Sequence, residues 1–150
     1  MNHAVVIDAS VAVKWVIYED FTDQARMLYE HSVLAHRPIL VPPHFAGEVV
    51  NVIYQRQRTR EPARRITEEE SDNALSRFSR FLFEPLVIPG LYERAFVFAR
   101  ANRLTNVYDS LYVVLAEMLE AELWTDDRRL INSVGEAAPW VRWIGDYEVA

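Results

Sequence analysis

The sequence predicts an α/β fold in which helices pack around a mostly parallel sheet of about five short strands. Short apolar runs, typical of strands buried on both faces, alternate with longer segments of helical apolar spacing. With 150 residues, of which 51% are hydrophobic, the chain has the size and composition of one domain with a real core. It contains no internal repeat, low-complexity tract or long linker, so we expect a single domain over residues 1–150.

The first half of the chain alternates between the two patterns. The run at residues 4–8 predicts a buried strand, and Ser10 can cap a short helix at residues 11–17. Helical spacing returns over residues 20–36, where Thr22 or Asp23 can cap. A second strand is expected at residues 39–41 and a third helix at residues 44–57, because Pro42-Pro43 ends a strand and suits a first helical turn.

The second half continues the alternation after a polar connection at residues 58–66. Thr67 and Glu70 have the spacing of a capping box, and we expect the helix that they open to end at Pro85. The remaining elements are expected as a strand at 86–88, helices at 91–101 and 108–120, a strand at 123–125, a short helix at 127–131 and a strand at 141–144. Strands that alternate with helices indicate βαβ units.

Several classes of function are excluded by what the chain lacks. It has no cysteine, which excludes disulfides, thiolate nucleophiles and cysteine zinc sites, and its four histidines show no ligand spacing. A Gly-x-Ser-x-Gly turn and phosphate-binding glycine loops are absent. No apolar run reaches the roughly 18–20 residues that span a bilayer, and no signal-peptide pattern precedes the first strand. We therefore expect a cytoplasmic protein without a membrane partner.

Four acidic residues fall where such a fold would bring them to one edge of the sheet. Asp8 closes the first strand, Glu48 interrupts an amphipathic helix, Asp109 opens another helix, and Asp127 follows the fourth strand. Ligand sites in parallel sheets lie at the carboxyl ends of the strands. Taken singly, Asp8, Asp109 and Asp127 could be helix caps, and Glu48 could lie on an exposed helix face. Asn51 would share the face of Glu48.

Taken together, the four carboxylates favour a divalent cation. Two carboxylates about 4 Å apart repel by roughly 4 kcal/mol at an effective dielectric constant near 20, so a cluster needs a positive partner. Oxygen ligands without cysteine or a histidine pair select Mg²⁺ or Mn²⁺ over Zn²⁺. Because Mg²⁺ also binds substrate phosphates, the implied substrate is a phosphoester.

The segments around these acids resemble, in order, the four acidic motifs of PIN-domain ribonucleases, and in particular of VapC-type toxins. The segments are VIDASVAVKW at 6–15, VPPHFAGEVVNV at 41–52, YDSLYVVLA at 108–116 and LWTDDRRL at 123–130. The resemblance implies a three-layer α/β/α fold and endonucleolytic cleavage of RNA with Mg²⁺ or Mn²⁺. It also implies a cognate VapB-type antitoxin that blocks the site, and usually a homodimer.

The same resemblance implies roles for individual residues. Asp8, Glu48, Asp109 and Asp127 would form the catalytic, metal-binding set, with Asp8 and Asp109 as the main ligands. Ser10 and Thr125 would support them through their hydroxyl groups. Asp126 occupies a position that is usually small or amide-bearing in the family, and it competes with Asp127 for the fourth place.

The basic residues are unevenly distributed in a chain whose net charge is -6. That charge argues against a protein that coats nucleic acid. A cluster of arginines nevertheless suits an RNA-backbone track, or else a solvated helix end; its members are Arg56, Arg58, Arg60, Arg64 and Arg65. Lys14 could contact a phosphate or simply lie at the surface.

Other functions remain open at this point. One is a PIN-type RNA-processing nuclease that is not a toxin. Another is a non-catalytic, Mg²⁺-binding module of the receiver type or an interaction module. A receiver would need paired acids after the first strand, whereas the pair here, Asp126-Asp127, lies near the carboxyl end. A haloacid-dehalogenase-type phosphatase would need Asp-x-Asp in the place of Asp8-Ala9-Ser10.

Overall fold

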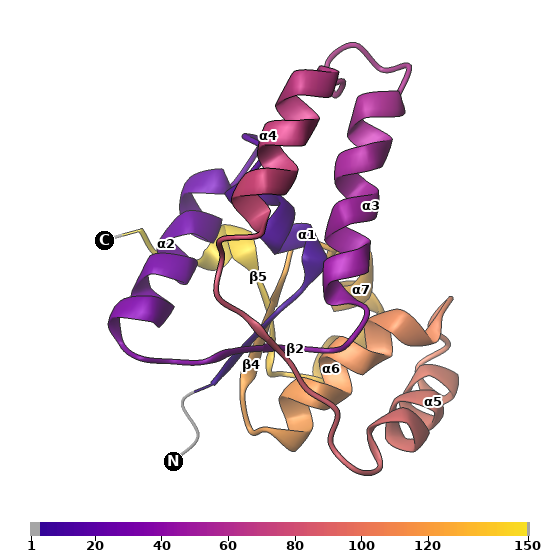
Figure 1. Ribbon diagram of the computed structural model, residues 1–150. Helices are drawn as coiled ribbons and strands as arrows, with labels where there is room; N and C mark the ends of the chain where they lie inside the picture. Colours follow the sequence, from indigo (N-terminus) through magenta and orange to yellow (C-terminus); the bar gives the residue numbers. More distant parts are fainter. Residues whose placement is uncertain (1–3, 150) are drawn as a thin grey trace.

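The computed structural model describes residues 4–149 and places them around a five-stranded sheet (Figure 1). The strand order is β3-β2-β1-β4-β5, and each neighbouring pair is parallel. The strands are β1 (Val5–Ile7), β2 (Ile39–Val41), β3 (Glu84–Pro85), β4 (Glu122–Thr125) and β5 (Val141–Trp143). The expected fold class, with its parallel sheet, is confirmed.

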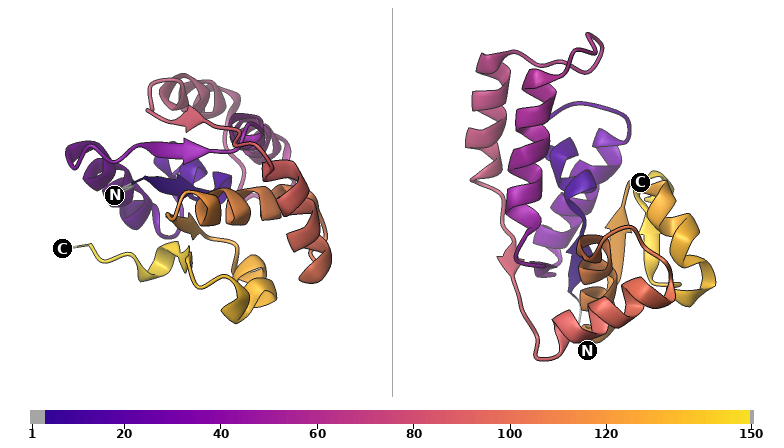
Figure 2. Two further views of the ribbon diagram at one scale, coloured as in Figure 1. Left: turned by 90° about the horizontal axis from the view of Figure 1, so that it is seen from below. Right: turned by 90° about the vertical axis from the view of Figure 1, so that its right-hand side faces the viewer.

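Helices lie on both faces of this sheet, which gives the three-layer arrangement (Figure 2). The α-helices are α1 (Ala9–Ala12), α2 (Thr22–Leu34), α3 (Phe45–Arg58), α4 (Glu68–Phe78), α5 (Leu91–Ala101), α6 (Val107–Met118) and α7 (Arg128–Val134). Three short 3₁₀ segments are η1 (Val13–Trp15), η2 (Gly135–Ala137) and η3 (Ile144–Asp146). Among the described residues, no helix is long and apolar enough to cross a membrane.

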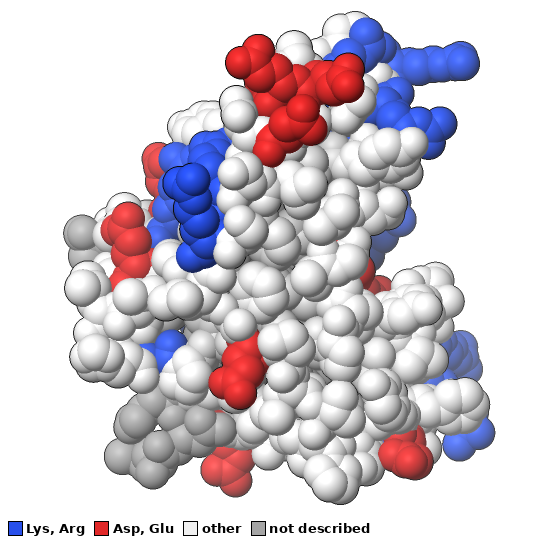
Figure 3. Space-filling model, in the orientation of Figure 1, with Lys and Arg blue, Asp and Glu red and all other residues white. Residues whose placement is uncertain are grey.

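Helices α3 and α4 extend together beyond the sheet as a helical pair (Figure 1). The capping box at the start of α4 is present, because Thr67 accepts the backbone N–H of Glu70 and Glu70 accepts that of Thr67. Acidic side chains crowd this end of α4, while basic side chains crowd the nearby end of α3 (Figure 3). The tip of the pair therefore carries both signs of charge.

The third strand differs from the expectation. It lies at Glu84–Pro85 instead of residues 86–88, and α4 ends at Phe78 instead of continuing to Pro85. The chain turns early because Phe83 stacks on Phe78, with ring centroids 5.4 Å apart, and because the Tyr29 hydroxyl accepts the Leu82 N–H. A proline is tolerated in β3 because β3 is an edge strand, where a missing donor breaks no ladder.

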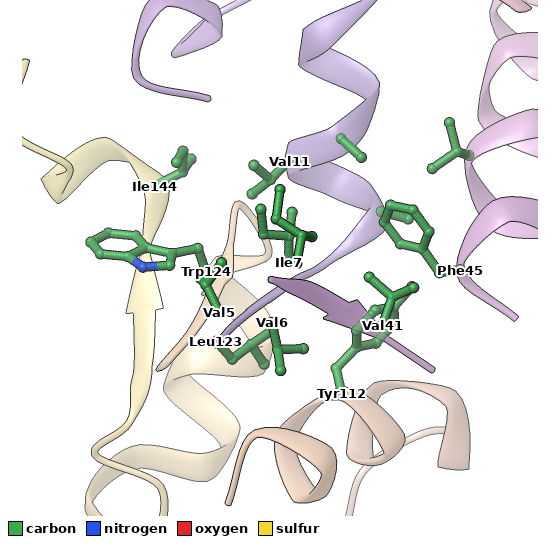
Figure 4. Close-up of a cluster of buried hydrophobic side chains, with 14 of the residues drawn as sticks. Val5, Val6, Ile7, Val11, Val41, Phe45, Tyr112, Leu123, Trp124 and Ile144 are labelled. Carbon is green, nitrogen blue, oxygen red and sulfur yellow. The ribbon is translucent and has the colours of Figure 1, made fainter. Parts of the chain in front are cut away.

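The middle strand of the sheet positions the first acidic residue. Val5, Val6 and Ile7 of β1 are completely buried between β2 and β4, within an apolar core that Figure 4 shows in close-up. Burying each such side chain contributes roughly 1.5–3 kcal/mol, so the strand is held firmly in place. The chain leaves this core at Asp8, whose N–H donates to the carbonyl of Trp124 in β4.

Candidate functional site

The four expected acids lie at the edge of the sheet where the parallel strands end. Asp8 follows β1, and Asp127 follows β4, which is the neighbour of β1 in the sheet. Glu48 lies in the first turn of α3, and Asp109 lies in the first turn of α6. The charges of Glu48 and Asp109 raise the pKa of Asp8, and the charges of Asp127 and Glu48 raise that of Asp109, so the fold brings all four into electrostatic contact.

Asp8 is a buried carboxylate with hydroxyl partners. Only 7% of the residue is exposed, and its Oδ2 accepts hydrogen bonds from Ser10 Oγ at 2.9 Å and Thr125 Oγ1 at 2.6 Å. It occupies the N-cap position of α1, but its side chain makes no capping bond. Within residues 4–149, no basic side chain forms an ion pair with it. Helix capping therefore does not explain this residue.

The two hydroxyls also hold the turn after β4. Ser10 Oγ accepts the N–H of Asp126, and Thr125 Oγ1 accepts the N–H of Asp127, each at 3.0 Å. Because each hydroxyl oxygen already accepts an amide, its own hydrogen is available for the carboxylate of Asp8. The expected support by Ser10 and Thr125 thus has a definite geometry, which links Asp8 to the turn between β4 and α7.

Burial raises the pKa of Asp8 from 3.8 to about 6. Hydrogen bonds from Thr125 and Ser10 act in the opposite direction, and the charges of Glu48 and Asp109 raise the pKa further. The physical cause is that a carboxylate in an apolar surrounding loses its hydration and faces like charges. A cation at this edge of the sheet would remove both penalties.

Glu48 is held by two aromatic side chains that the sequence alone did not single out. Tyr112 donates to Glu48 Oε1 at 2.6 Å, and His44 Nε2 lies 3.0 Å from the same oxygen. The imidazole nitrogen is poorly aligned for a hydrogen bond, and the contact is an ion pair only when His44 is protonated. Burial, followed by the charges of Asp8 and Glu48, holds the pKa of Tyr112 well above its usual range, and the phenol stays a donor.

The spacing of these two residues could have indicated their place. His44 precedes Glu48 by four residues, and Tyr112 follows Asp109 by three, so each lies on the same helix face as an acid. Helical spacing around each acid therefore indicates both residues. Spacing between histidines does not indicate His44, because its partner is an acid.

Asp109 is free of the capping role that its position suggested. The N-cap of α6 is Asn106, whose side-chain oxygen accepts the Asp109 N–H at 3.1 Å. Partial burial raises the pKa of Asp109, with further contributions from the charges of Asp127 and Glu48, whereas Asn106 and His44 lower it. The carboxylate of Asp109 therefore faces the other acids.

The adjacent residues Asp126 and Asp127 have different surroundings. Asp127 Oδ1 caps α7 by accepting the N–H groups of Arg129 and Leu130, and the charge of Asp127 raises the pKa of Asp109. Asp126 uses both oxygens, with Oδ2 at 2.9 Å from Lys14 Nζ and Oδ1 accepting from Trp143 at 3.1 Å. Asp127 thus combines a capping bond with a position near the other acids.

Lys14 lies inside the protein, where it is only 2% exposed, and this corrects the expectation of a phosphate contact or a surface position. Its ammonium group contacts Asp126, Glu19 Oε1 at 3.0 Å and the carbonyl of Asp20 at 2.7 Å. The other oxygen of Glu19 pairs with Arg56 at 2.7 Å. A chain of charges therefore runs from Asp126 to Arg56.

The remaining accessory residues are the arginine cluster and Asn51, and the structure gives them different surroundings. Arg56 is buried, and its Nε also donates to the carbonyl of Arg64, which leaves it poorly placed to form part of an open RNA track. The rest of that cluster is exposed, namely Arg58, Arg60, Arg64 and Arg65. Asn51 is exposed as well, and no hydrogen bond joins it to an acid in the described part of the chain.

The donor set suits a hard divalent ion. Among residues 4–149, no group of three or more acidic or histidine side chains is close enough together to hold a metal ion directly. Mg²⁺ commonly binds through one or two carboxylates, keeps several waters and contacts substrate phosphates. The buried Asp8, which faces two like charges and has no cationic partner in the described structure, fits such a site.

The raised pKa of Asp8 predicts how stability depends on pH. Because the folded protein holds the proton more tightly than the unfolded chain, this stabilisation is complete below about pH 4 and is lost as the pH rises through about 6. The loss at pH 7 is about 3 kcal/mol. Without metal, urea denaturation should show the Asp8→Asn variant gaining about that much over the wild type between pH 4 and pH 7. An equal pH dependence in both proteins would contradict this.

Comparison with known proteins places the chain in a family. The sequence profile of the PIN domain matches residues 5–136. The structure of PAE2754 from Pyrobaculum aerophilum is similar, with a TM-score of 0.61 and 19% identity over 97% of this chain and 93% of that one. At this identity, the likeness shows the fold alone. No curated protein matches the sequence.

Proposed function

The chain belongs to the PIN domain family, whose members are generally Mg²⁺-dependent nucleases, and we propose that it is an endoribonuclease that hydrolyses RNA phosphodiester bonds. The observation that carries the proposal is the buried Asp8, next to the like charges of Glu48 and Asp109 and without a cationic partner in the described structure. A protein fold retains such a destabilising group when a ligand compensates it.

In the proposed site, Asp8 and Asp109 hold the metal, and Glu48 and Asp127 bind it directly or through waters. The metal, Mg²⁺ or Mn²⁺, would supply Lewis-acid chemistry at the phosphoryl group and a water of lowered pKa for in-line attack. The protein then acts by orientation. Tyr112 fixes Glu48, and the hydroxyls of Ser10 and Thr125 fix Asp8. No side-chain nucleophile is needed.

Asp127 is the better candidate for the fourth acid. Its charge acts on Asp109, whereas both oxygens of Asp126 are engaged by Lys14 and Trp143. In this assignment Asp126 is a positioning residue, since it ties the turn after β4 to the interior. Asp127 keeps Oδ2 available, because only Oδ1 takes part in the cap of α7.

The resemblance of the four segments to VapC-type toxins supports a more specific role. In this role the protein is the toxin of a toxin–antitoxin pair in the cytoplasm, acts as a homodimer and is inhibited by a VapB-type antitoxin. The alternative is an RNA-processing nuclease that is not a toxin. The neighbouring gene discriminates between them, since a small upstream reading frame for a DNA-binding partner favours the toxin.

Metal binding provides a direct test that does not depend on finding the natural RNA. Calorimetric titration with Mn²⁺ should show binding to the wild type and none to the double variant Asp8→Asn/Asp109→Asn, because both main ligands lose their charge. The matched control is Asp72→Asn, which removes one exposed acid from α4. Unchanged Mn²⁺ binding by the double variant would rule out the proposed site.

The same preparation allows a test of the reaction. Cleavage of single-stranded RNA should stop in EDTA and return on addition of excess Mn²⁺. Cleavage that persists in EDTA would exclude a metal-dependent mechanism.

A further inference from the structure

A hollow lies apart from the four acids of the candidate site, between α2, the end of α3, α4 and the segment after η1. It has a volume of about 750 Å³ and is lined by five arginines, Arg26, Arg56, Arg65, Arg77 and Arg80. We call it the arginine hollow. Part of its basic lining faces the viewer between α2 and α4 in Figure 3. One third of the 15 arginines of an acidic chain thus surround one cavity.

Carboxylates do not balance this concentration of charge. Among the described residues that line the hollow, Glu70 is the one acid, and it already accepts the Thr67 N–H as part of the capping box. Arg56 is paired with Glu19. Among residues 4–149, the other four arginines form no ion pair. The electrostatic field in the hollow therefore favours an anion.

Backbone carbonyls hold two of these side chains in place. Arg77 donates from Nη2 to the carbonyl of Val16 at 2.6 Å, and Arg65 donates from Nε to that of Thr59 at 2.8 Å. Each guanidinium group keeps further N–H donors available, since five are present and only one is used in these bonds. Groups that are oriented in advance lose less freedom on binding, and their planar fork matches a phosphate.

An exposed aromatic ring completes the lining. Tyr18 is 74% exposed, and it borders the same hollow as the arginines. Proteins that bind single-stranded nucleic acid combine a basic groove for the backbone with aromatic rings on which bases stack. An acidic peptide would use the arginines but has no need of a flat, exposed ring. The combination therefore favours a nucleic acid over an acidic protein segment.

Helix α3 connects the arginine hollow to the acidic edge of the sheet. Glu48, Val52 and Gln55 share one face of the helix, and Gln55 lies about 10 Å along the axis from Glu48. A smaller hollow of about 400 Å³ begins at Val52 and Gln55 and is bordered by Arg56, which also lines the arginine hollow. A single strand of RNA can thus follow α3 from one site to the other.

We propose that the arginine hollow anchors single-stranded RNA outside the acidic site, with the four arginines other than Arg56 on the phosphates and Tyr18 stacked on a base. The inference rests on the proposed function, since RNA is taken to be the substrate. The anchor supplies the attraction that the acidic edge cannot supply, because that edge repels a polyanion. It also differs from the expected track, since Arg26, Arg77 and Arg80 lie on α2 and at the end of α4.

The test measures binding of a fluorescently labelled, single-stranded RNA oligonucleotide in EDTA, where cleavage is suppressed. Arg26→Gln/Arg80→Gln removes two side chains that have no hydrogen-bond or ion-pair partner among the described residues, so the fold should be unaffected. The Kd should rise about tenfold, and the slope of log K against log salt should fall by about 1.4. Tyr18→Ala should raise the Kd about fivefold or more.

The matched control is Arg100→Gln/Arg103→Gln, which removes the same charge from exposed positions near the end of α5 and should leave the Kd unchanged. Thermal melting checks that all variants are folded. Wild-type affinity in Arg26→Gln/Arg80→Gln, or an equal loss in the control, would overturn the anchor. Tighter binding of a polyglutamate peptide than of the RNA would also overturn the anchor.

The two proposals fail in different ways. If the wild type cleaves RNA with Mn²⁺ but Arg26→Gln/Arg80→Gln binds RNA normally, the anchor is wrong and the nuclease stands. If that variant loses RNA binding but the wild type cleaves nothing with Mg²⁺ or Mn²⁺, the arginine hollow remains an RNA-binding site and the nuclease is wrong.

Discussion

Replacing Asp8 by asparagine is expected to lower RNA cleavage by at least about a thousandfold while leaving the protein folded. Asparagine keeps an oxygen that can accept from Ser10 and Thr125, so the hydrogen bonds that join β1 to the turn after β4 survive. It removes the negative charge that a metal ion would neutralise. The change therefore affects the chemistry of the site and not its construction.

The measurement compares initial cleavage rates of a single-stranded RNA in saturating Mn²⁺. Asp72→Asn on α4 serves as the matched control and should retain the wild-type rate, because this exposed acid lies outside the site. Asp127→Asn should lose far more activity than Asp126→Asn if Asp127 is the fourth acid. Retained cleavage in Asp8→Asn would refute the role assigned to Asp8.

The Lys14→Met variant should lose about 3–5 kcal/mol of unfolding free energy. Methionine fills a similar space, but it leaves Glu19 and Asp126 without the ammonium group that lies about 3 Å from each. It also leaves the carbonyl of Asp20 without its donor. Removing one member of a buried ionic group is destabilising mainly because the remaining charges stay in a poorly hydrated place.

Urea denaturation at constant pH measures this loss, and Arg103→Gln provides an exposed cation whose removal should change stability by less than about 0.5 kcal/mol. A double-mutant cycle with Asp126→Asn isolates the pair, because the second change should recover part of the loss. A loss below about 1 kcal/mol in Lys14→Met would show that the ionic group contributes little.

Much of the fold could be predicted because its signals are local. The strand at residues 39–41 and the helix at residues 91–101 lie where apolar spacing placed them. The capping box at Thr67 and Glu70 is present for the same reason, since both partners lie within one turn. The third strand was misplaced because its position depends on the stacking of Phe83 on Phe78, and spacing carries no information about that contact.

The candidate site was predictable in outline for a related reason. The carboxyl ends of parallel strands meet at one edge of the sheet, so the order of elements is sufficient to bring Asp8 and Asp127 together. The same rule does not reveal which partner each side chain takes. Asp126 and Asp127 are neighbours in the chain, but one contacts Lys14 while the other caps α7.

The sequence by itself determined the parallel α/β architecture and the edge at which the acids lie, and it predicted the kind of ion that they suit, because periodicity, strand ends and ligand chemistry are properties of short segments. Only the tertiary structure decided that Lys14 and Arg56 lie inside, that Tyr112 holds Glu48, and that Arg26 and Arg80 line one hollow with Tyr18. These pairings join residues from different elements, and they follow from how the helices pack on the sheet.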